Sequence, residues 1–178
     1  MNPTRQAVTE KESHLAQDLL EELEREARTT RRVLERVPED RLAWRPHERA
    51  RSLGELAMHV AIVPGAVAEL IASASPAQVP TFTDPRLDGT AELIPTLEES
   101  LARARRALNG MSDGALTATW RMMQGERELF AIPRVTLLRS IMLNHWYHHR
   151  GQLTVYLREL GLPVPSIYGP SADENPFA

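Results

Sequence analysis

The sequence predicts an all-α protein folded as a four-helix bundle. Four long segments repeat apolar residues at steps of three and four, which places those residues on one face of a helix. Proline and glycine separate the segments, and none of them shows the alternation that is typical of a half-buried strand. Helices with one apolar face each bury those faces by packing against one another, and four of them form a bundle.

The first helix is expected over residues 10–36, because Pro38 cannot continue it. Residues 1–9 are polar and are expected to form a flexible tail, so that residues 10–178 make up a single domain. The length of 178 residues suits one domain with a substantial core.

The second helix is expected to begin after Ser52, because Glu55 follows three residues later at the spacing of a capping box. Pro64 lies inside this helix. A proline removes one backbone donor and its ring crowds the carbonyl group four residues earlier, here that of Val60. We therefore expect a kink in the helix near His59.

The remaining elements follow in order. Residues 73–89 are rich in Pro, Ala, Ser and Asp and predict a long loop that crosses the end of the bundle. A third helix is expected to begin between Thr90 and Pro95, with Gly110 as its C-terminal stop, and residues 115–132 predict a short hairpin or ordered loop. The last helix is expected over residues 134–160, because Gly161 is a typical residue after a helix end.

Composition limits the function. The chain is 42% hydrophobic and 25% charged, and its net charge of −3 with interleaved signs predicts neither a nucleic acid nor an anionic membrane as partner. We see no secretory signal and no apolar run near the length that spans a bilayer, so we expect a cytoplasmic protein. The chain has no cysteine, so any metal must be held by His, Asp, Glu or water. Any thiol in the chemistry must come from a small molecule.

Two histidines of the last helix occupy positions that leucines normally take. His145 and His149 are four residues apart and lie on one helix face. They belong to an apolar row with these other members: Leu138, Met142, Leu153, Tyr156, Leu160. His59 falls on or beside the apolar row of the second helix. Three neutral imidazoles that converge in a bundle core suit Zn²⁺, Ni²⁺ or Fe²⁺ and leave a fourth position open for water or a small-molecule substrate.

Simpler interpretations apply to the other residues near this pattern. A lone helical histidine is usually structural, and His14, His47 and His148 have no partner in the pattern. Arg150 and Tyr168 are expected to form a surface pair or to serve packing. The tryptophans are expected to anchor the core or an interface. Three polar side chains are near enough to orient the imidazoles, although the pattern assigns none of them: Glu55, Asn144, Gln152.

A carboxylate-bridged di-iron centre does not fit these residues. Such a bundle requires two Glu-x-x-His pairs and further inward glutamates. The nearest run is Glu55 to His59, which is one residue too long, and the last helix has no glutamate near its histidines.

Three stretches resemble the DinB-like (damage-inducible) family: LGELAMHVA at 53–61 with the following Pro64-Gly65, NHWYHHRGQL at 144–153, and VPSIYGPS at 164–171. The resemblance implies a bundle with an up-down-down-up helix order. It also implies a divalent metal held by His59, His145 and His149, and a homodimer. The family name is no evidence for DNA binding.

The resemblance leaves three functions open. The first is an enzyme that transfers a low-molecular-weight thiol onto an electrophile at the metal. The second is a metal-dependent hydrolase of an ester or amide, with Glu55 as a weak candidate for the acid or base. The third is a metal-binding dimeric module without catalytic activity.

Overall fold

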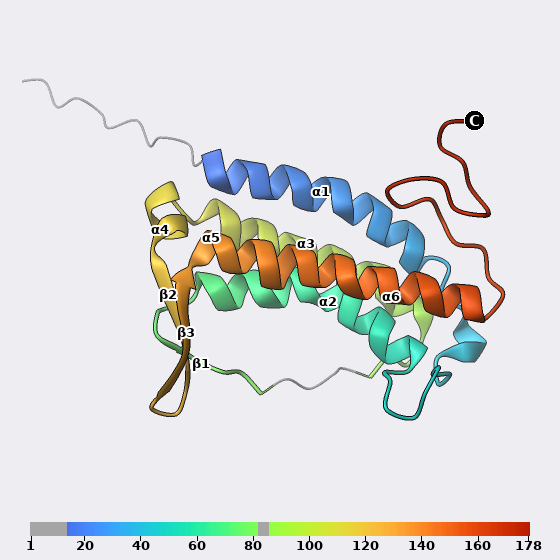
Figure 1. Ribbon diagram of the computed structural model, residues 1–178, viewed down its shortest axis with the longest axis horizontal. Helices are drawn as coiled ribbons and strands as arrows, with labels where there is room; N and C mark the ends of the chain where they lie inside the picture. The colour runs from blue at the N-terminus through green and yellow to red at the C-terminus, as the bar shows by residue number, and fades with distance from the viewer. Residues whose placement is uncertain (1–13, 82–85) are drawn as a thin grey trace, which may run out of the picture.

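The computed structural model describes residues 14–81 and 86–178, and in these its main body is a bundle of four long helices (Figure 1). The long helices are α1 (His14–Leu34), α2 (Leu53–Ala72), α3 (Leu93–Asn109) and α6 (His145–Glu159). The short elements are η1 (Glu39–Arg41), β1 (Ala77–Gln78), η2 (Thr90–Glu92), α4 (Asp113–Thr117), β2 (Thr119–Gln124), β3 (Arg127–Pro133), α5 (Arg134–Leu137) and η3 (Leu138–Asn144). The predicted four-helix bundle is confirmed, while the expected tail over residues 1–9 lies outside the described residues.

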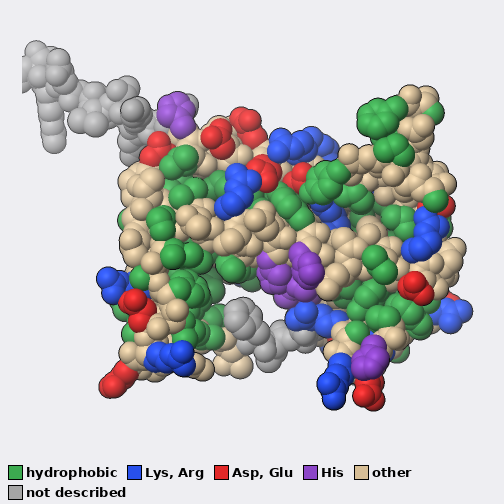
Figure 2. All heavy atoms as spheres, in the orientation of Figure 1, with side chains coloured by type: hydrophobic (Ala, Val, Ile, Leu, Met, Phe, Trp, Pro, Cys, Tyr) green, Lys and Arg blue, Asp and Glu red, His purple; other side chains and the backbone are tan. Residues whose placement is uncertain are grey.

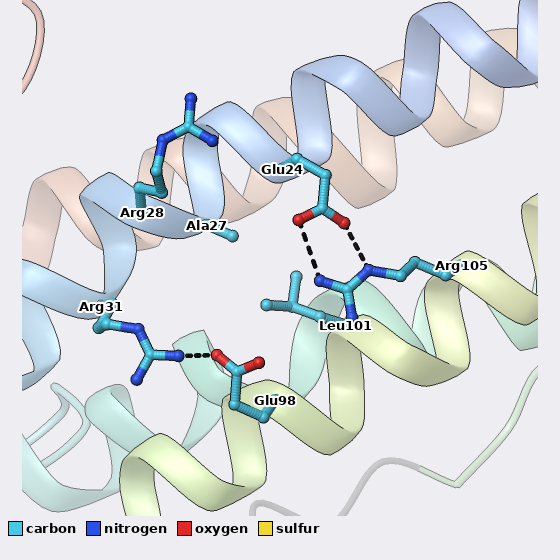
Figure 3. A pocket seen from close by; sticks show the side chains of 7 residues that line it. All are labelled: Glu24, Ala27, Arg28, Arg31, Glu98, Leu101 and Arg105. Atoms are coloured by element: carbon cyan, nitrogen blue, oxygen red, sulfur yellow. Dashed lines mark hydrogen bonds and ion pairs between the residues drawn. The ribbon is translucent and has the colours of Figure 1, made fainter.

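Ion pairs show that α1 and α3 run antiparallel. Glu24 pairs with Arg105, and Arg31, seven residues further along α1, pairs with Glu98, seven residues earlier in α3. Figure 3 shows both pairs around a shallow pocket above Leu101. The charges that line this pocket largely neutralise one another, so it is not a strong candidate for a functional site.

The helices α2 and α3 run parallel. The Gly65 N–H of α2 donates to Ser100 Oγ of α3 at 2.9 Å, and Glu69 pairs with Arg103. A parallel pair requires a connection that returns along the bundle, and of this connection the structure describes residues 73–81 and 86–89 (Figure 1). Gly65 permits the close approach, because a Cβ atom there would lie 2.6 Å from the Ser100 carbonyl oxygen.

The last helix runs parallel to α1 and antiparallel to α2. Tyr147 donates to Glu22 and Arg150 to Glu26, so residue numbers rise together in α1 and α6. The bundle therefore has the up-down-down-up order that the family resemblance implied.

The segment before the last helix is a hairpin, one of the two forms predicted for it. Strands β2 and β3 pair antiparallel around a tight turn in which Gly125 has a φ of +60°. Two elements here were not expected from the sequence. The helix α4 begins after Ser112, whose hydroxyl accepts from the Ala115 N–H, and β1 adds a parallel strand to β2. Both are short, and short elements carry little periodicity.

The predicted helix over residues 134–160 contains a π-helical stretch, η3, between α5 and α6. Its wider turns change which residues face inward, because each hydrogen bond spans five residues instead of four. The expected row is buried at Leu138, Met142, His149 and Leu153, but Tyr156 and Leu160 are only partly buried. Their places on the buried face are taken by Trp146, Arg150 and Leu157.

The expectation that no apolar run approaches the length of a membrane span is wrong for α2. This helix has 20 residues, and an 18-residue stretch of it has a mean hydropathy of 1.5. However, 61% of that stretch is buried within the bundle, as is usual for a core helix of a globular fold.

Candidate metal centre

The three predicted histidines meet between two antiparallel helices. His59 comes from α2, while His145 and His149 come from the first turns of α6. Their ring centroids lie 5.4 Å apart for His59 and His145, 4.6 Å for His59 and His149, and 4.4 Å for His145 and His149. One ring nitrogen from each residue lies within 4.8 Å of the other two. The histidine cluster reaches the surface near the middle of the face shown in Figure 2.

Pro64 contributes to this convergence. It cannot donate to the Val60 carbonyl group, and that oxygen instead accepts a hydrogen bond from Trp146 Nε1 at 2.8 Å. The indole belongs to α6 and lies next to His145, while Val60 follows His59 directly. The bond therefore holds α6 against α2 at the level of the histidine cluster.

Ser100 of α3 provides further hydrogen bonds to backbone groups of α2 next to Pro64. Its hydroxyl accepts from the Gly65 N–H at 2.9 Å and donates to the Ile62 carbonyl at 3.0 Å. The α2 helix continues through Pro64 and changes direction along its length in Figure 1, in agreement with the kink expected there.

Hydrogen bonds determine the tautomers of the two histidines of α6. His149 Nδ1 lies 2.7 Å from Gln152 Oε1, and His145 Nδ1 lies 3.3 Å from the Ile141 carbonyl oxygen. A carbonyl oxygen can only accept, so each Nδ1 carries the proton and each Nε2 has a lone pair. The two Nε2 atoms lie 2.6 Å apart. Two lone pairs at this distance repel unless a proton or a metal ion lies between them.

The pKa values favour the neutral, ligating form of these imidazoles. The pKa of His149 is lowered from 6.5 to about 4, chiefly by burial and to a smaller extent by the neighbouring His145, Arg51 and His148, although the hydrogen bond to Gln152 raises it. Burial also lowers the pKa of His145, with smaller contributions from His148 and Arg51. Near neutral pH both rings are therefore uncharged, as a metal ligand must be.

The geometry fits a divalent metal. Zinc–nitrogen bonds of about 2.0–2.1 Å place the ligand nitrogens of a tetrahedral site about 3.3 Å apart. The separations here run from 2.6 Å for the closest pair to at most 4.8 Å, so small side-chain shifts would bring all three into range. His59, His145 and His149 each offer one ring nitrogen, so the cluster could hold a metal ion through three nitrogens.

Gln152 fixes the orientation of one ligand, a role that the sequence suggested only by proximity. The sequence feature that indicates this contact is the position of Gln152 three residues after His149, one helical turn away.

Glu55 has a different environment. Its carboxylate accepts from the Ser52 N–H at 2.6 Å, completes the predicted capping box, and lies 3.7 Å from Arg45. Its action as an acid or base remains a prediction. His14, His47, Asn144 and His148 are exposed, outside the cluster.

Of the two interpretations of Arg150, a surface pair is wrong and packing is confirmed, because this side chain is 1% exposed. Its guanidinium donates to the Glu26 carboxylate at 2.7 Å, the Thr30 hydroxyl at 3.1 Å and the Tyr168 hydroxyl at 2.6 Å. Tyr168 donates in turn to Glu26 at 2.8 Å. Arg150 lies beside His149 and three residues before Leu153, so it shares the buried side of α6 with them although the expected row did not include it.

The class of protein is thus a four-helix bundle of up-down-down-up order with a three-histidine cluster between its second and last long helices. The chain belongs to the DinB family, whose sequence model matches residues 8–176. It is 29% identical over 161 residues to the uncharacterized protein YrdA of Bacillus subtilis, a match that covers 87% of this chain and 89% of YrdA.

Two solved structures share the fold. A DinB-like protein from Bacillus cereus has a TM-score of 0.65 at 23% identity, and the match covers 85% of this chain and 97% of the other. YfiT from Bacillus subtilis, described as a probable metal-dependent hydrolase with an unusual four-helix bundle topology, has a TM-score of 0.63 at 12% identity and covers 91% and 95%. Identities this low establish the fold only.

Proposed function

We propose that this chain is a metal-dependent enzyme that transfers a low-molecular-weight thiol onto an electrophile. The observation that supports it is the pair of Nε2 atoms at 2.6 Å, both in the tautomer that presents a lone pair, with His59 as a third donor. A divalent metal held there would stabilise a thiolate and so make sulfur nucleophilic at neutral pH.

The residues of the chain bind and orient the reactants in this proposal. His59, His145 and His149 hold the metal, and Gln152 keeps the His149 ring in its ligating orientation by accepting from Nδ1. The chain has no cysteine, so an external thiol would meet no competing protein thiol. Within the described residues, no carboxylate joins the three rings in the cluster, so the protein offers no obvious base there for the activation of water.

The alternative is a metal-dependent hydrolase of an ester or amide. The description of YfiT as a probable metal-dependent hydrolase favours it. This function requires a proton acceptor beside the metal, and Glu55, one helical turn before His59, is the candidate. Full hydrolytic activity in the Glu55→Gln variant would remove that candidate.

Metal content is the first experiment. Elemental analysis of protein without affinity-tag histidines should find one divalent metal ion per chain. The same measurement should show whether that metal is Zn, Ni or Fe. The variants His59→Ala, His145→Ala and His149→Ala should lose the metal, whereas the matched control His148→Ala, at an exposed neighbouring position, should retain it. Absence of stoichiometric metal from the unaltered protein would contradict both enzyme proposals.

Activity is the second experiment. Metal-loaded protein is incubated with several thiols and a chromogenic electrophile, and in parallel with chromogenic esters. We expect thiol transfer that disappears in His59→Ala and persists in His148→Ala. Ester hydrolysis without thiol transfer would favour the alternative. The absence of both reactions would favour a metal-binding module. Homodimerisation of that module is still a prediction, and sedimentation would test it.

A further inference from the structure

The exposed side of the last helix carries almost no charge. Residues 140–157 include a single residue of the types Asp, Glu, Lys and Arg, the buried Arg150, in a chain that is 25% charged. The exposed positions of α1 and α3, by contrast, are mostly charged. In Figure 2 uncharged atoms prevail along the line that α6 follows in Figure 1. A helix face that is exposed and uncharged is typical of a surface that another protein covers.

Two aliphatic side chains are exposed on this side of the helix. Ile141 of η3 is 44% exposed and Val155 of α6 is 57% exposed. Among the large hydrophobic side chains that are exposed in residues 14–81 and 86–178, these two alone lie in helices. Burial of both would remove apolar surface from water, which favours association.

The exposed residues are arranged symmetrically about His148. Ile141 and Val155 lie seven residues before and after it, and Asn144 and Gln152 lie four residues before and after it. These five residues are called the α6 face below. When two α6 faces pack antiparallel with the His148 residues opposite each other, each aliphatic side chain meets the other aliphatic type, and each amide meets an amide. A surface that is complementary to itself in this way forms a twofold interface between identical chains.

Gly151 permits a close approach at the centre of the α6 face. It is exposed and lies three residues after His148. A Cβ atom added to Gly151 would have no atom within 4 Å, so the space beside it is open. A side chain from a second copy can therefore lie against the backbone there.

Charges of opposite sign lie at the two ends of the α6 face. Arg139 is exposed before it and Glu159 is exposed after it, although Arg139 also pairs with Glu22. Antiparallel packing brings Arg139 of each copy to the end that carries Glu159 of the other. Parallel packing would bring like charges together, so the charges favour the antiparallel direction.

We propose that the α6 face joins two copies of this chain through antiparallel α6 helices, with the twofold axis at His148. The His148 ring lies 5.0 Å from the His149 ring, so the interface adjoins the histidine cluster of each copy. The interface does not depend on which reaction the cluster performs. It assigns a surface to the homodimer, for which the family resemblance implied none.

The experiment measures the mass of the full chain in solution by sedimentation. Ile141→Glu and Val155→Arg each place one charge in the interface without a partner. The double variant Ile141→Glu/Val155→Arg places opposite charges against each other in an antiparallel pair, but like charges in a parallel pair. Leu129→Glu, at an exposed aliphatic position of the hairpin, is the matched control.

We expect a dimer for the unaltered chain and for Leu129→Glu. Each single variant of the α6 face should weaken dimerisation at least about tenfold, and the double variant should recover most of that loss. Circular dichroism should show equal helical content in every variant. A monomeric unaltered chain, a dimer that both single variants preserve, or equal weakening by Leu129→Glu would overturn the interface. A double variant that dissociates as much as the single variants would overturn its antiparallel direction.

The position of the twofold axis can be tested by crosslinking, because the chain has no cysteine. Residues that face each other across a twofold axis can come within the distance of a disulfide. Under mild oxidation His148→Cys should form a covalent dimer, whereas Glu99→Cys, at an exposed position of α3, should remain uncrosslinked. Equal crosslinking of the two variants would contradict an axis at His148.

Discussion

Two polar clusters lie on adjacent faces of α6, and they differ in how their charges are balanced. His149 and Arg150 are neighbours in the chain, about 100° apart around the helix, and are 8% and 1% exposed. Arg150 faces α1 and meets a carboxylate and two hydroxyl groups. His149 faces α2 and meets two further imidazoles.

The Arg150 cluster is complete within the chain. Its positive charge is matched by Glu26, and the rings of Tyr147 and Tyr168 each lie 5.2 Å from the guanidinium carbon. In the histidine cluster the Nε2 atoms of His145 and His149 lie close together, and a cation bound from outside would stabilise their facing lone pairs. The difference separates a buried polar group that maintains the fold from one that is ready to bind, although both occupy the same helix.

The largest effect is expected from opening the complete cluster. Arg150→Met leaves the Glu26 carboxylate buried without its charge partner, so the free energy of unfolding should fall by about 3–5 kcal/mol. Denaturant unfolding followed by circular dichroism measures it. The double variant Arg150→Met/Glu26→Gln should recover most of the loss. A loss below about 1 kcal/mol in the single variant would show that the cluster contributes little to stability.

Metal should stabilise the protein only through the histidine cluster. At a free metal concentration a hundred times the Kd, unfolding should cost about 2.7 kcal/mol more than in the presence of a chelator. His149→Ala should abolish this difference, and the Arg150→Met/Glu26→Gln variant should keep it. Thermal unfolding with and without chelator measures both. If metal stabilised His149→Ala equally, it would bind elsewhere.

Removal of the group that orients His149 should weaken metal binding without loss of the ligands. Gln152→Leu deletes the acceptor at Nδ1 and should raise the metal Kd about 10–100-fold. Competition with a chromogenic chelator measures it. Gln152→Glu, which keeps an acceptor oxygen, is the matched control and should bind at least as tightly as the natural chain. An unchanged Kd in Gln152→Leu would assign no orienting role to this residue.

The smallest effect concerns pH in the metal-free protein. The pKa of His149 is lowered to about 4 in the folded chain, chiefly by burial, against 6.5 in the unfolded chain. Between these values the unfolded chain binds more protons, so stability should fall as the pH drops from 6.5 to 4. His149→Gln should flatten this part of the stability–pH curve relative to a His148→Gln control. An equally steep curve would place the titrating group elsewhere.

The periodicity of the sequence was enough to predict the long helices, because each buries one face over several turns. It also brought His59, His145 and His149 together as candidates, since a buried imidazole at a leucine position is unusual. It missed Arg150, which is buried while Tyr156 is only partly buried, and it missed the π-helical stretch η3. A π-helical stretch depends on tertiary packing, and nothing in the residue pattern of 138–144 distinguished it from a regular helix.

By itself, the sequence determined the four helices, the proline in α2 and the three histidines, because these follow from local periodicity and backbone chemistry. Only the tertiary structure decided what each buried polar group meets. It gave the Val60 carbonyl to Trp146 and Glu26 to Arg150. These partners are 86 and 124 residues apart in the chain, and they come into contact only when helices of fixed direction pack side by side.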